Sequence, residues 1–259
     1  MAGPRRRLGA AWMALPALLF VLVPIVALAA KAPWSRALST LSDTGAWTAL
    51  RVSLEVTLGA VAISLVVAMP AAWALARTDF PGRRLVRALI VLPIVLPPVV
   101  AGVALLATFG RLGLVGGLMQ SVGVHLVFTT AGAAVAAAFV SAPFLVLALE
   151  SGFRAVDQRF EDAARSLGAS RWYVFRRITL PEVRPALVAG LLLTWARALG
   201  EFGATITFAG NFRGTTQTLS LAVFQTLQTD PAGAYVVSLM MLVASVAVLV
   251  AVGGRFLVR

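Results

Sequence analysis

The chain has 259 residues, of which 60% are hydrophobic and 12% charged, and its formal net charge is +12. A mean hydropathy of +0.92 leaves too little polar surface for a soluble globule, so the composition predicts a membrane protein. With no cysteine and one histidine, disulfides, thiolate chemistry and metal sites built on several histidines are excluded.

Six stretches are long and apolar enough to cross a membrane. Cutting the sequence at charged residues leaves runs of at least the roughly 20 residues that span about 30 Å of hydrocarbon as a helix. One further run, 185–212, is interrupted only by Arg197 and Glu201. We therefore predict an all-α, polytopic membrane protein. The predicted helices cover residues 12–30, 52–76, 87–109, 128–149, 185–209 and 235–253.

The first of these helices has a rival interpretation. Three arginines, Arg5 to Arg7, precede its apolar stretch, and Ala27-Leu28-Ala29 near its end has the small-residue pattern of a signal-peptide cleavage site. The apolar stretch is long for a secretory signal, and its two prolines suit a retained span as well. Cleavage would leave five helices and an external N-terminus.

The basic residues orient the predicted helices. With both termini in the cytoplasm, sixteen arginines fall inside, including seven in the segment 154–184. Five basic residues remain outside: Lys31, Arg36, Arg51, Arg111 and Arg213. This asymmetry satisfies the positive-inside rule. It also accounts for the positive net charge without nucleic acid, because the arginines gather at membrane edges and no basic, aromatic-laced soluble domain is present.

The third predicted span is rich in proline. Pro93, Pro97 and Pro98 fall inside it, and proline removes backbone hydrogen bonds from a helix. Such breaks are tolerated at membrane depth only where protein or a water-filled cavity covers them. The span is therefore expected to bend, either as an ordinary kink in a bundle or as part of a transport pathway.

A polar segment, 150–184, separates the fourth and fifth predicted spans. Apolar residues recur in it at steps of three and four, which predicts a short amphipathic helix; they are Phe153, Val156, Phe160, Ala163, Ala164 and Leu167. Gly168 can take the left-handed conformation that ends such a helix, and Ser170 can cap a second helix running to about residue 178. Pro181 and Pro185 are expected to break and restart the chain. The segment is either a docking hook or a basic helix lying on the lipid surface.

The fifth predicted span carries two charges at membrane depth. Arg197 and Glu201 lie one helical turn apart and can pair, because a lone charge there is costly. The pair is either structural or part of a pathway or subunit interface. Residues expected in a gate, pathway or interface are Pro97, Pro98, Arg197, Glu201, Thr205 and Thr207.

The spacing of the polar segment resembles a known family. Asp162-Ala163-Ala164, three residues, Gly168, nine residues and Ile178-Thr179-Leu180-Pro181 is similar to the cytoplasmic "EAA" loop of the membrane subunits of ATP-binding-cassette importers. Asp162 stands where glutamate is usual, with Glu161 just before it. The resemblance implies the type I importer permease fold and a loop that couples to an ATPase. The coupling residues it implies are Phe160, Glu161, Asp162, Ala163, Ala164, Gly168, Ile178, Leu180 and Pro181.

A narrower resemblance covers roughly residues 49 to 253. The runs 196–208 and 92–100 are similar to the membrane subunits of molybdate importers, whereas Gly200 to Gly203 is shared with sulfate permeases. The likeness implies a homodimer in the inner membrane of a prokaryote, with two copies of a separate ATPase that bind ATP and magnesium. It also implies an external molybdate-binding protein that carries affinity and much of the selectivity. The alternatives are a permease for sulfate or another oxyanion, an ion-gradient-driven transporter and a membrane assembly protein.

We expect no enzyme and no cofactor in this chain. The only lysine, Lys31, has no surrounding glycines that could form a phosphate-binding loop. A catalytic triad with His125 is not expected, because Asp43 and Asp230 lie far from it in sequence and nothing else supports a triad. The expected organisation is a first helix and outer loop in 1–48 and a permease domain in 49–253 containing the coupling loop 150–184. A cytoplasmic tail is expected in 254–259.

Overall fold

The computed structural model describes residues 4–253, and the side chains of residues 12–251. The described part is all-α, as predicted, and contains no strand. Its helices are α1 (Pro4–Lys31), η1 (Trp34–Arg36), α2 (Ala37–Asp43), α3 (Ala46–Arg77), α4 (Arg83–Val95), α5 (Pro98–Phe109), α6 (Gly116–Ser121), α7 (Thr130–Ala155), α8 (Gln158–Ser166), α9 (Arg171–Val174), η2 (Phe175–Thr179), α10 (Leu180–Leu199), α11 (Gly203–Ala209), α12 (Leu219–Thr229) and α13 (Pro231–Gly253). The predicted tail 254–259 lies outside the described residues.

Five helical segments in the described part are long and apolar enough to cross a membrane, and the bent pair α4–α5 makes six if it counts as one span. This agrees with the six spans predicted. The second helix is longer than predicted, since α3 begins at Ala46 rather than near residue 52. Residues of the predicted outer loop before it form η1 and α2.

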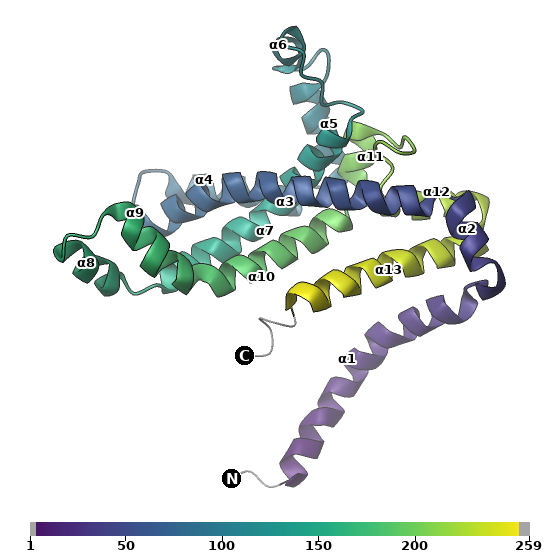
Figure 1. Cartoon of the computed structure of the whole chain (residues 1–259), viewed down its shortest axis with the longest axis horizontal. Helices are drawn as coiled ribbons and strands as arrows, with labels where there is room; N and C mark the ends of the chain where they lie inside the picture. Colours follow the sequence, from purple (N-terminus) through teal and green to yellow (C-terminus); the bar gives the residue numbers. More distant parts are fainter. Residues whose placement is uncertain (1–3, 254–259) are drawn as a thin grey trace.

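The centre of the bundle is α7, which packs between α3 and α10 (Figure 1). Its sequence explains the place, because small residues allow close approach of neighbouring helices in membranes. Ala133, Ala137 and Ala138 of α7 meet Val52, Val56 and Ala60 of α3 in one buried cluster. The side-chain oxygen of Thr129 caps α7 by accepting a hydrogen bond from the backbone amide of Gly132 (3.0 Å).

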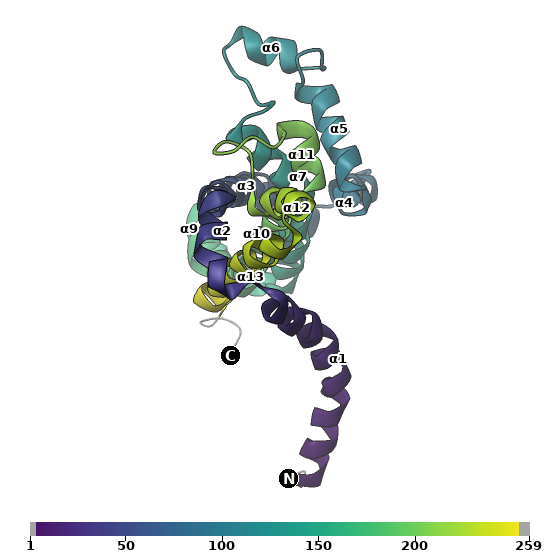
Figure 2. The same cartoon turned by 90° about the vertical axis from the view of Figure 1, so that its right-hand side faces the viewer.

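The first helix stands apart from this bundle. None of the residues in the apolar window of α1 is buried, and both views show it leaving the other helices at an angle (Figure 2). Among the long helices, α13 is the one against which it packs most. Its apolar surface is therefore left for lipid or for another chain.

Two predicted spans are broken rather than continuous, which corrects the expected ranges 87–109 and 185–209. Helix α4 ends at Val95, and α5 starts at Pro98 after a bend of 116°. Helix α10 ends at Leu199, and α11 begins only at Gly203. Adjacent prolines cause the first break, because neither can donate a helical hydrogen bond and Leu96 before them is extended.

The polar segment 150–184 also differs from prediction in its helix limits. Phe153 belongs to the end of α7, and the amphipathic helix starts only at Gln158. Pro181 and Pro185 do not break the chain, because the helix runs without interruption from Arg171 to Leu199. The π-helical turn η2 just before Pro181 widens the helix where the proline ring would otherwise meet a carbonyl.

Candidate functional site

Helices α8 and α9 form a hook at one end of the bundle, beyond the ends of α3, α7 and α10 (Figure 1). Asp157 caps α8 by accepting from the backbone amide of Arg159 (3.0 Å), and Ser170 caps α9 by accepting from that of Tyr173 (3.2 Å). Between them Gly168 has φ +87°, the left-handed value predicted from the sequence. The two caps and the glycine fix the angle at which the hook turns.

Glu161 fastens the hook to the bundle. Its side chain lies almost fully buried, and its Oε1 accepts hydrogen bonds from Arg77 Nη2 (3.0 Å) at the end of α3 and from Thr179 Oγ1 (2.7 Å) in η2. Arg165 Nη2 lies 3.4 Å from the other oxygen. One carboxylate therefore joins three elements, and charge-assisted bonds of this kind are among the strongest available to side chains.

Asp162, the residue at the glutamate position of the motif, points elsewhere. Its side chain is 69% exposed, and its one ion pair within the described part of the chain is with Arg165 at 3.7 Å. The motif residue is thus free to meet a partner, while its neighbour Glu161 holds the hook in place. Sequence spacing alone did not assign the two acidic residues these different positions.

The outer surface of the hook is apolar and uncovered. Phe160, Leu167, Trp172 and Tyr173 are each more than half exposed, with Leu167 at 90%. Trp172 stacks on Phe175 with ring centroids 5.8 Å apart, which holds the indole in one position. Large exposed apolar groups in an otherwise polar segment mark an interaction surface.

Ile178, Leu180 and Pro181, also predicted in the coupling loop, lie along η2 and the first turn of α10. They do not belong to the exposed tip of the hook. Thr179 between them is buried and binds Glu161. This part of the motif therefore joins the hook to the long helix behind it.

A second buried carboxylate, Glu150, lies near the end of α7 and was missed by the sequence analysis. Its side chain is 2% exposed and accepts from Arg87 Nε of α4 (3.0 Å) and from Arg154 one turn along α7. The sequence held one signal, since Arg154 follows Glu150 at the i+4 spacing of a helical ion pair. The partner on α4 depends on the fold.

The short second halves of the two broken spans, α5 and α11, pack against each other. A Cβ atom on Gly203 would lie 2.8 Å from Pro98 Cβ and 3.1 Å from the amide nitrogen of Val99, and one on Gly102 would lie 2.6 Å from Thr207 Cβ. Only glycine allows backbones to approach so closely. Pro98 of α5 and Thr207 of α11, two of the residues predicted for a gate or pathway, both lie at this contact.

The predicted pair Arg197–Glu201 is present, although Glu201 follows the end of α10 rather than lying within a span. Arg197 Nη1 and Glu201 Oε2 are 2.7 Å apart, and Glu201 is buried while Arg197 is partly exposed. The other oxygen of Glu201 accepts from the backbone amide of Ala204 (2.8 Å) and so caps α11. The carboxylate therefore stabilises the break between α10 and α11.

Thr205 and Pro97 complete the predicted set. Thr205 is fully buried on α11, and its hydroxyl has no hydrogen-bond partner among the described residues. Pro97 immediately precedes α5 and takes an extended backbone at the bend. The six predicted residues thus lie in or beside the two breaks. Arg197 and Glu201 pair with each other, and the backbones of α5 and α11 approach closely.

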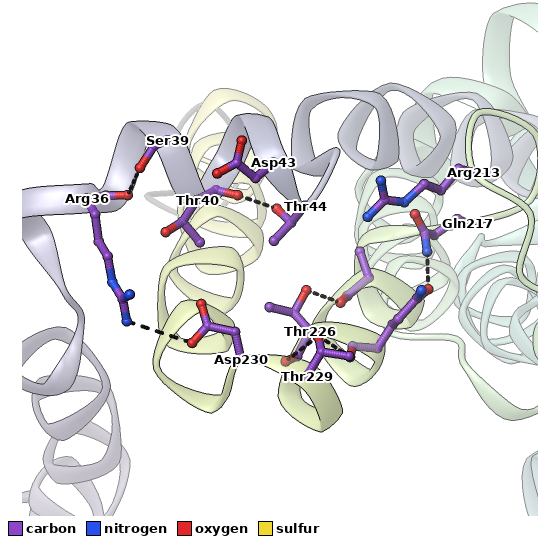
Figure 3. Close-up of a pocket in the computed structure, with 12 residues that line it drawn as sticks. Arg36, Ser39, Thr40, Asp43, Thr44, Arg213, Gln217, Thr226, Thr229 and Asp230 are labelled. Atoms are coloured by element: carbon purple, nitrogen blue, oxygen red, sulfur yellow. Dashed lines mark hydrogen bonds and ion pairs between the residues drawn. The ribbon is translucent and has the colours of Figure 1, made fainter.

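A polar pocket of about 540 Å³ lies at the opposite end of the molecule from the hook, between α2 and α12. Figure 3 shows Arg36 and Arg213 on opposite sides of it, with Asp230 beside Arg36 at 3.8 Å. Threonine hydroxyls of both helices line the floor, yet those of Thr44 and Thr226 donate to carbonyls of their own helices. Two arginines and two aspartates leave this pocket without an excess charge.

No group of three or more histidine, aspartate or glutamate side chains that could hold a metal occurs among the described residues. The candidate functional features are therefore the exposed hook, the carboxylates behind it and the two broken spans. These features have no catalytic chemistry in common. They lie in succession from the hook at one end of the bundle to the breaks within the spans.

Comparison with known proteins agrees with this arrangement. Residues 64–256 match the family model described as binding-protein-dependent transport system inner membrane component. The molybdenum transport system permease protein ModB of Mycobacterium tuberculosis is 41% identical over 247 residues, covering 94% of each chain. That of Escherichia coli K12 is 45% identical over 184 residues, 71% of this chain and 80% of the relative. The sulfate transport system permease protein CysT of the same strain is 38% identical over 81% of this chain and 77% of its own length.

Solved structures show the same fold. A bacterial importer of the acidic polysaccharide alginate superposes with TM-score 0.70 at 18% identity, covering 97% of this chain and 96% of the other. The MetNI methionine transporter in an inward-facing conformation superposes with TM-score 0.62 at 19% identity, covering 81% and 95%. At these identities the likeness concerns the fold alone, and both are ATP-binding-cassette transporters.

Proposed function

Because this chain belongs to the family of binding-protein-dependent transport system inner membrane components, we propose that it is the permease subunit of an ATP-driven importer of molybdate, with tungstate as a co-substrate. The observation that carries the proposal is the 41% identity to a molybdenum permease over 94% of both chains. Membership of the family makes the chain a multi-span membrane transport subunit rather than an enzyme.

The hook is the proposed site of coupling to the ATPase. Phe160, Leu167 and Trp172 present an exposed apolar surface that a cytoplasmic partner can bury, and the exposed carboxylate of Asp162 lies beside it. Phe160, Asp162, Ala163, Ala164 and Gly168 form the docking part of this loop. Ile178, Leu180 and Pro181 continue it into α10, and Glu161 ties it to α3.

The proposed transport cycle uses these connections. Closing of two ATPase subunits brings two hooks together, and Glu161 and the continuous helix 171–199 pass the movement to α3 and to the break at 200–202. The permease then accepts the anion from its binding protein on the outer side and releases it inward after hydrolysis. Such coupling requires that the ATPase bind the two states of the permease with different affinity.

The anion pathway is proposed to pass the contact of α5 with α11. Helices broken at membrane depth are tolerated where they line a cavity or pack on protein, and Pro97, Pro98, Thr205 and Thr207 lie at these breaks. Arg197 and Glu201 hold the second break in shape. In a homodimer the two copies would place two such contacts around one pathway.

The partners we propose are a second copy of the chain, two copies of an ATPase that binds ATP and magnesium, and an external molybdate-binding protein. Selection among oxyanions of similar size is assigned to the binding protein. The outer segments contribute five basic residues against Asp43 and Asp230, an excess that favours anions without distinguishing them. The permease domain is assigned to 49–253, with the first helix as an addition to it.

The proposed location is the inner membrane of a prokaryote with both termini in the cytoplasm. Sixteen basic residues fall inside and five outside in this orientation. Reporter fusions after Arg159 and after Arg259 should be cytoplasmic, and a fusion near Asp230 should be external. An external reporter after Arg159 would overturn the orientation and the coupling mechanism together.

Uptake in cells tests the substrate. A strain lacking this chain should lose high-affinity molybdate uptake and molybdoenzyme activity when molybdate is scarce, and recover the activity when molybdate is abundant. Sulfur auxotrophy with intact molybdate uptake would identify sulfate as the substrate instead.

Reconstitution in liposomes tests the energy source. Uptake should require ATP, the ATPase and the binding protein together. Gradient-driven uptake by this chain alone would make it a secondary transporter, and no flux under either condition would favour an assembly role.

A further inference from the structure

A strongly basic cavity lies at the turn between α3 and α4, on the hook side of the molecule. It encloses about 580 Å³ and is lined by Asp79, Phe80, Gly82, Arg83, Arg84, Arg87 and Arg154. Arg83 pairs with Asp79, whose side chain is 98% exposed, while Arg87 and Arg154 share the buried Glu150. Four guanidinium groups therefore face two carboxylates, and an excess of positive charge remains.

Arg84 supplies part of that excess. Its side chain is exposed, and no ion pair with it occurs among the described residues. The cavity also contains the start of α4, where Gly82 has φ +81° and no acidic residue lies in the first turn. The positive end of the helix dipole adds to the arginine charges. Guanidinium groups arranged in this way suit a phosphate oxyanion.

An apolar groove of about 370 Å³ lies on the same helices, deeper in the membrane. It is lined mainly by α3, α4 and α7, including Val67, Ala71, Leu89, Pro93 and Val146, with Leu105 and Phe109 of α5 at its end. Val67 and Leu89 are more than half exposed, so the groove is open to its surroundings. Its lining is almost entirely hydrocarbon apart from Ser64.

The cavity and the groove follow one another along the membrane normal. At 1.5 Å per helical residue, Pro93 lies about 9 Å deeper than Arg87 along α4, and Val146 lies about 12 Å deeper than Arg154 along α7. One leaflet contributes about 15 Å of hydrocarbon, half of the roughly 30 Å core. The basic cavity and the apolar groove are therefore separated along α4 and α7 by a distance that fits within one leaflet.

From this juxtaposition we propose that α3, α4 and α7 bind one anionic phospholipid of the cytoplasmic leaflet. The phosphate lies in the arginine cavity, and an acyl chain lies in the groove between α4 and α7. The leaflet follows from the orientation proposed above, whereas the binding site itself depends only on the geometry. Basic pockets between membrane helices on the cytoplasmic side are suited to anionic headgroups.

The groove distinguishes a lipid from a free anion. Molybdate or inorganic phosphate would need only the arginines and would gain nothing from Leu89 or Val67. A phospholipid uses both parts and bridges α4 to α7 beside the Glu150 contact. Bound lipid therefore holds α4 in the position from which the chain enters the bend before α5.

The first test measures which ligand binds. The full chain is purified with its ATPase in a neutral detergent, and bound lipid is measured by native mass spectrometry during titration with phosphatidylglycerol, phosphatidylcholine or sodium phosphate. Phosphatidylglycerol should bind and resist competition by phosphate. Equal binding of phosphatidylcholine, or displacement of lipid by equimolar phosphate, would overturn the proposal; the latter would identify a free-anion site.

Charge removal tests the cavity. At about fivefold per arginine, the double variant Arg83→Gln/Arg84→Gln should weaken phosphatidylglycerol binding by about 25-fold. It leaves Arg87 and Arg154 on Glu150. The control Arg111→Gln removes an exposed arginine from the loop after α5 and should leave lipid binding unchanged. Equal binding by the double variant and the control would exclude the arginine cavity.

Two further variants test the groove. Ala71→Phe should fill it and reduce retention of phosphatidylglycerol while leaving the arginines in place. Because the chain has no cysteine, Leu89→Cys provides a single thiol, which should be labelled by a phosphatidylglycerol carrying a thiol-reactive acyl chain. If the thiol instead forms a disulfide with a cysteine placed in α1 of a second copy and lipid labelling is absent, a protein helix occupies the groove and the proposal fails. These readouts do not depend on molybdate transport, so they can fail while the proposed function holds.

Discussion

Glu161 and Glu201 are both buried carboxylates paired with arginine, yet they do different structural work. The two hydrogen-bond donors of Glu161 Oε1, Arg77 and Thr179, lie 84 and 18 residues away along the chain. The partners of Glu201 are Arg197, four residues before it, and the amide of Ala204, three residues after it. The first carboxylate joins separate elements, whereas the second shapes the backbone where one helix ends and the next begins.

Glu150 lies between these two cases. Arg154 is its neighbour on α7, and Arg87 comes from α4, 63 residues away. The carboxylates at the hook end thus connect helices, and the one at the break supports local geometry. Substitutions in the two regions should therefore fail differently: at the hook end in subunit coupling, and at the break in passage of the anion.

The largest effect is expected for Glu161→Ala. Arg77 has a side chain only 7% exposed, and leaving a buried charge without its partner costs about 3–5 kcal/mol. The hook should detach from α3, and thermal unfolding and co-purification with the ATPase should both show the loss. Asp162→Asn is the matched control, because its exposed side chain should change the unfolding free energy by no more than about 0.5 kcal/mol. Equal destabilisation by the two variants would remove the distinction between anchor and docking residue.

Gly203→Val tests the region of the breaks. Its Cβ would meet Pro98 Cβ and the backbone of Val99 at 2.8 and 3.1 Å, and overpacking of this kind costs about 1–3 kcal/mol. We expect ATP-driven molybdate uptake in liposomes to fall while association with the ATPase is kept. Gly200→Ala is the control, since its Cβ would have only an ordinary contact at 3.7 Å. Loss of ATPase association with normal uptake per assembled complex would contradict the division between regions.

Gly168→Val should destabilise the hook about as much as Gly203→Val destabilises the break. Its functional effect should be the reverse, because ATPase association rather than passage of the anion is lost. A residue branched at Cβ is strained at φ +87°, by about 1–3 kcal/mol, although the added atom would meet nothing within 4 Å. ATPase association and transport-coupled hydrolysis should fall while membrane insertion is unchanged. Gly168→Asn is the matched control, because asparagine tolerates the left-handed region. If valine and asparagine behave alike, backbone strain at this turn is not what positions the hook.

The smallest effect is the coupling between Arg197 and Glu201. Each single alanine substitution should destabilise the chain, and the double substitution should cost less than the sum by about 1 kcal/mol. Glu201→Ala should be the more harmful single change, because it also removes the cap of Ala204. Unfolding free energies of the four chains measure this term. Strict additivity would mean that the two residues act separately.

Local spacing allowed much of the hook to be predicted. Gly168 and Ser170 act within a few residues, so their roles follow from the sequence, as does the pair Arg197–Glu201. Glu161 could not be separated from Asp162, because the difference depends on Arg77 and on how α3 ends beside the hook. The same holds for Arg87 and Glu150, which only the folded chain brings together.

The spans show a similar limit. Apolar length predicted six membrane segments, and the prolines predicted a bend in the third. The size of that bend depends on the packing of α5 against α11. Gly102 and Gly203 allow this packing, because a side chain at either position would clash with the other helix. The break after Leu199 was missed, since an apolar run with few charges does not show where a buried carboxylate ends a helix. Pro181 was wrongly expected to interrupt the helix. The π-helical turn η2, which accommodates it, has no recognisable pattern in the sequence.

That widened turn has a mechanical consequence. Because η2 accommodates Pro181, the helix runs without a break from Arg171 to Leu199. It is 29 residues and roughly 43 Å long, with the hook at one end and Glu201 just past the other. A tilt of about 5° at the hook moves the far end of such a rod by about 4 Å. This displacement is comparable to the spacing of atoms in contact at the crossing of α5 and α11. The helix acts as a lever that turns about its hook end, so a small rotation at the hook becomes a displacement of several ångströms at the far end, where the anion would pass.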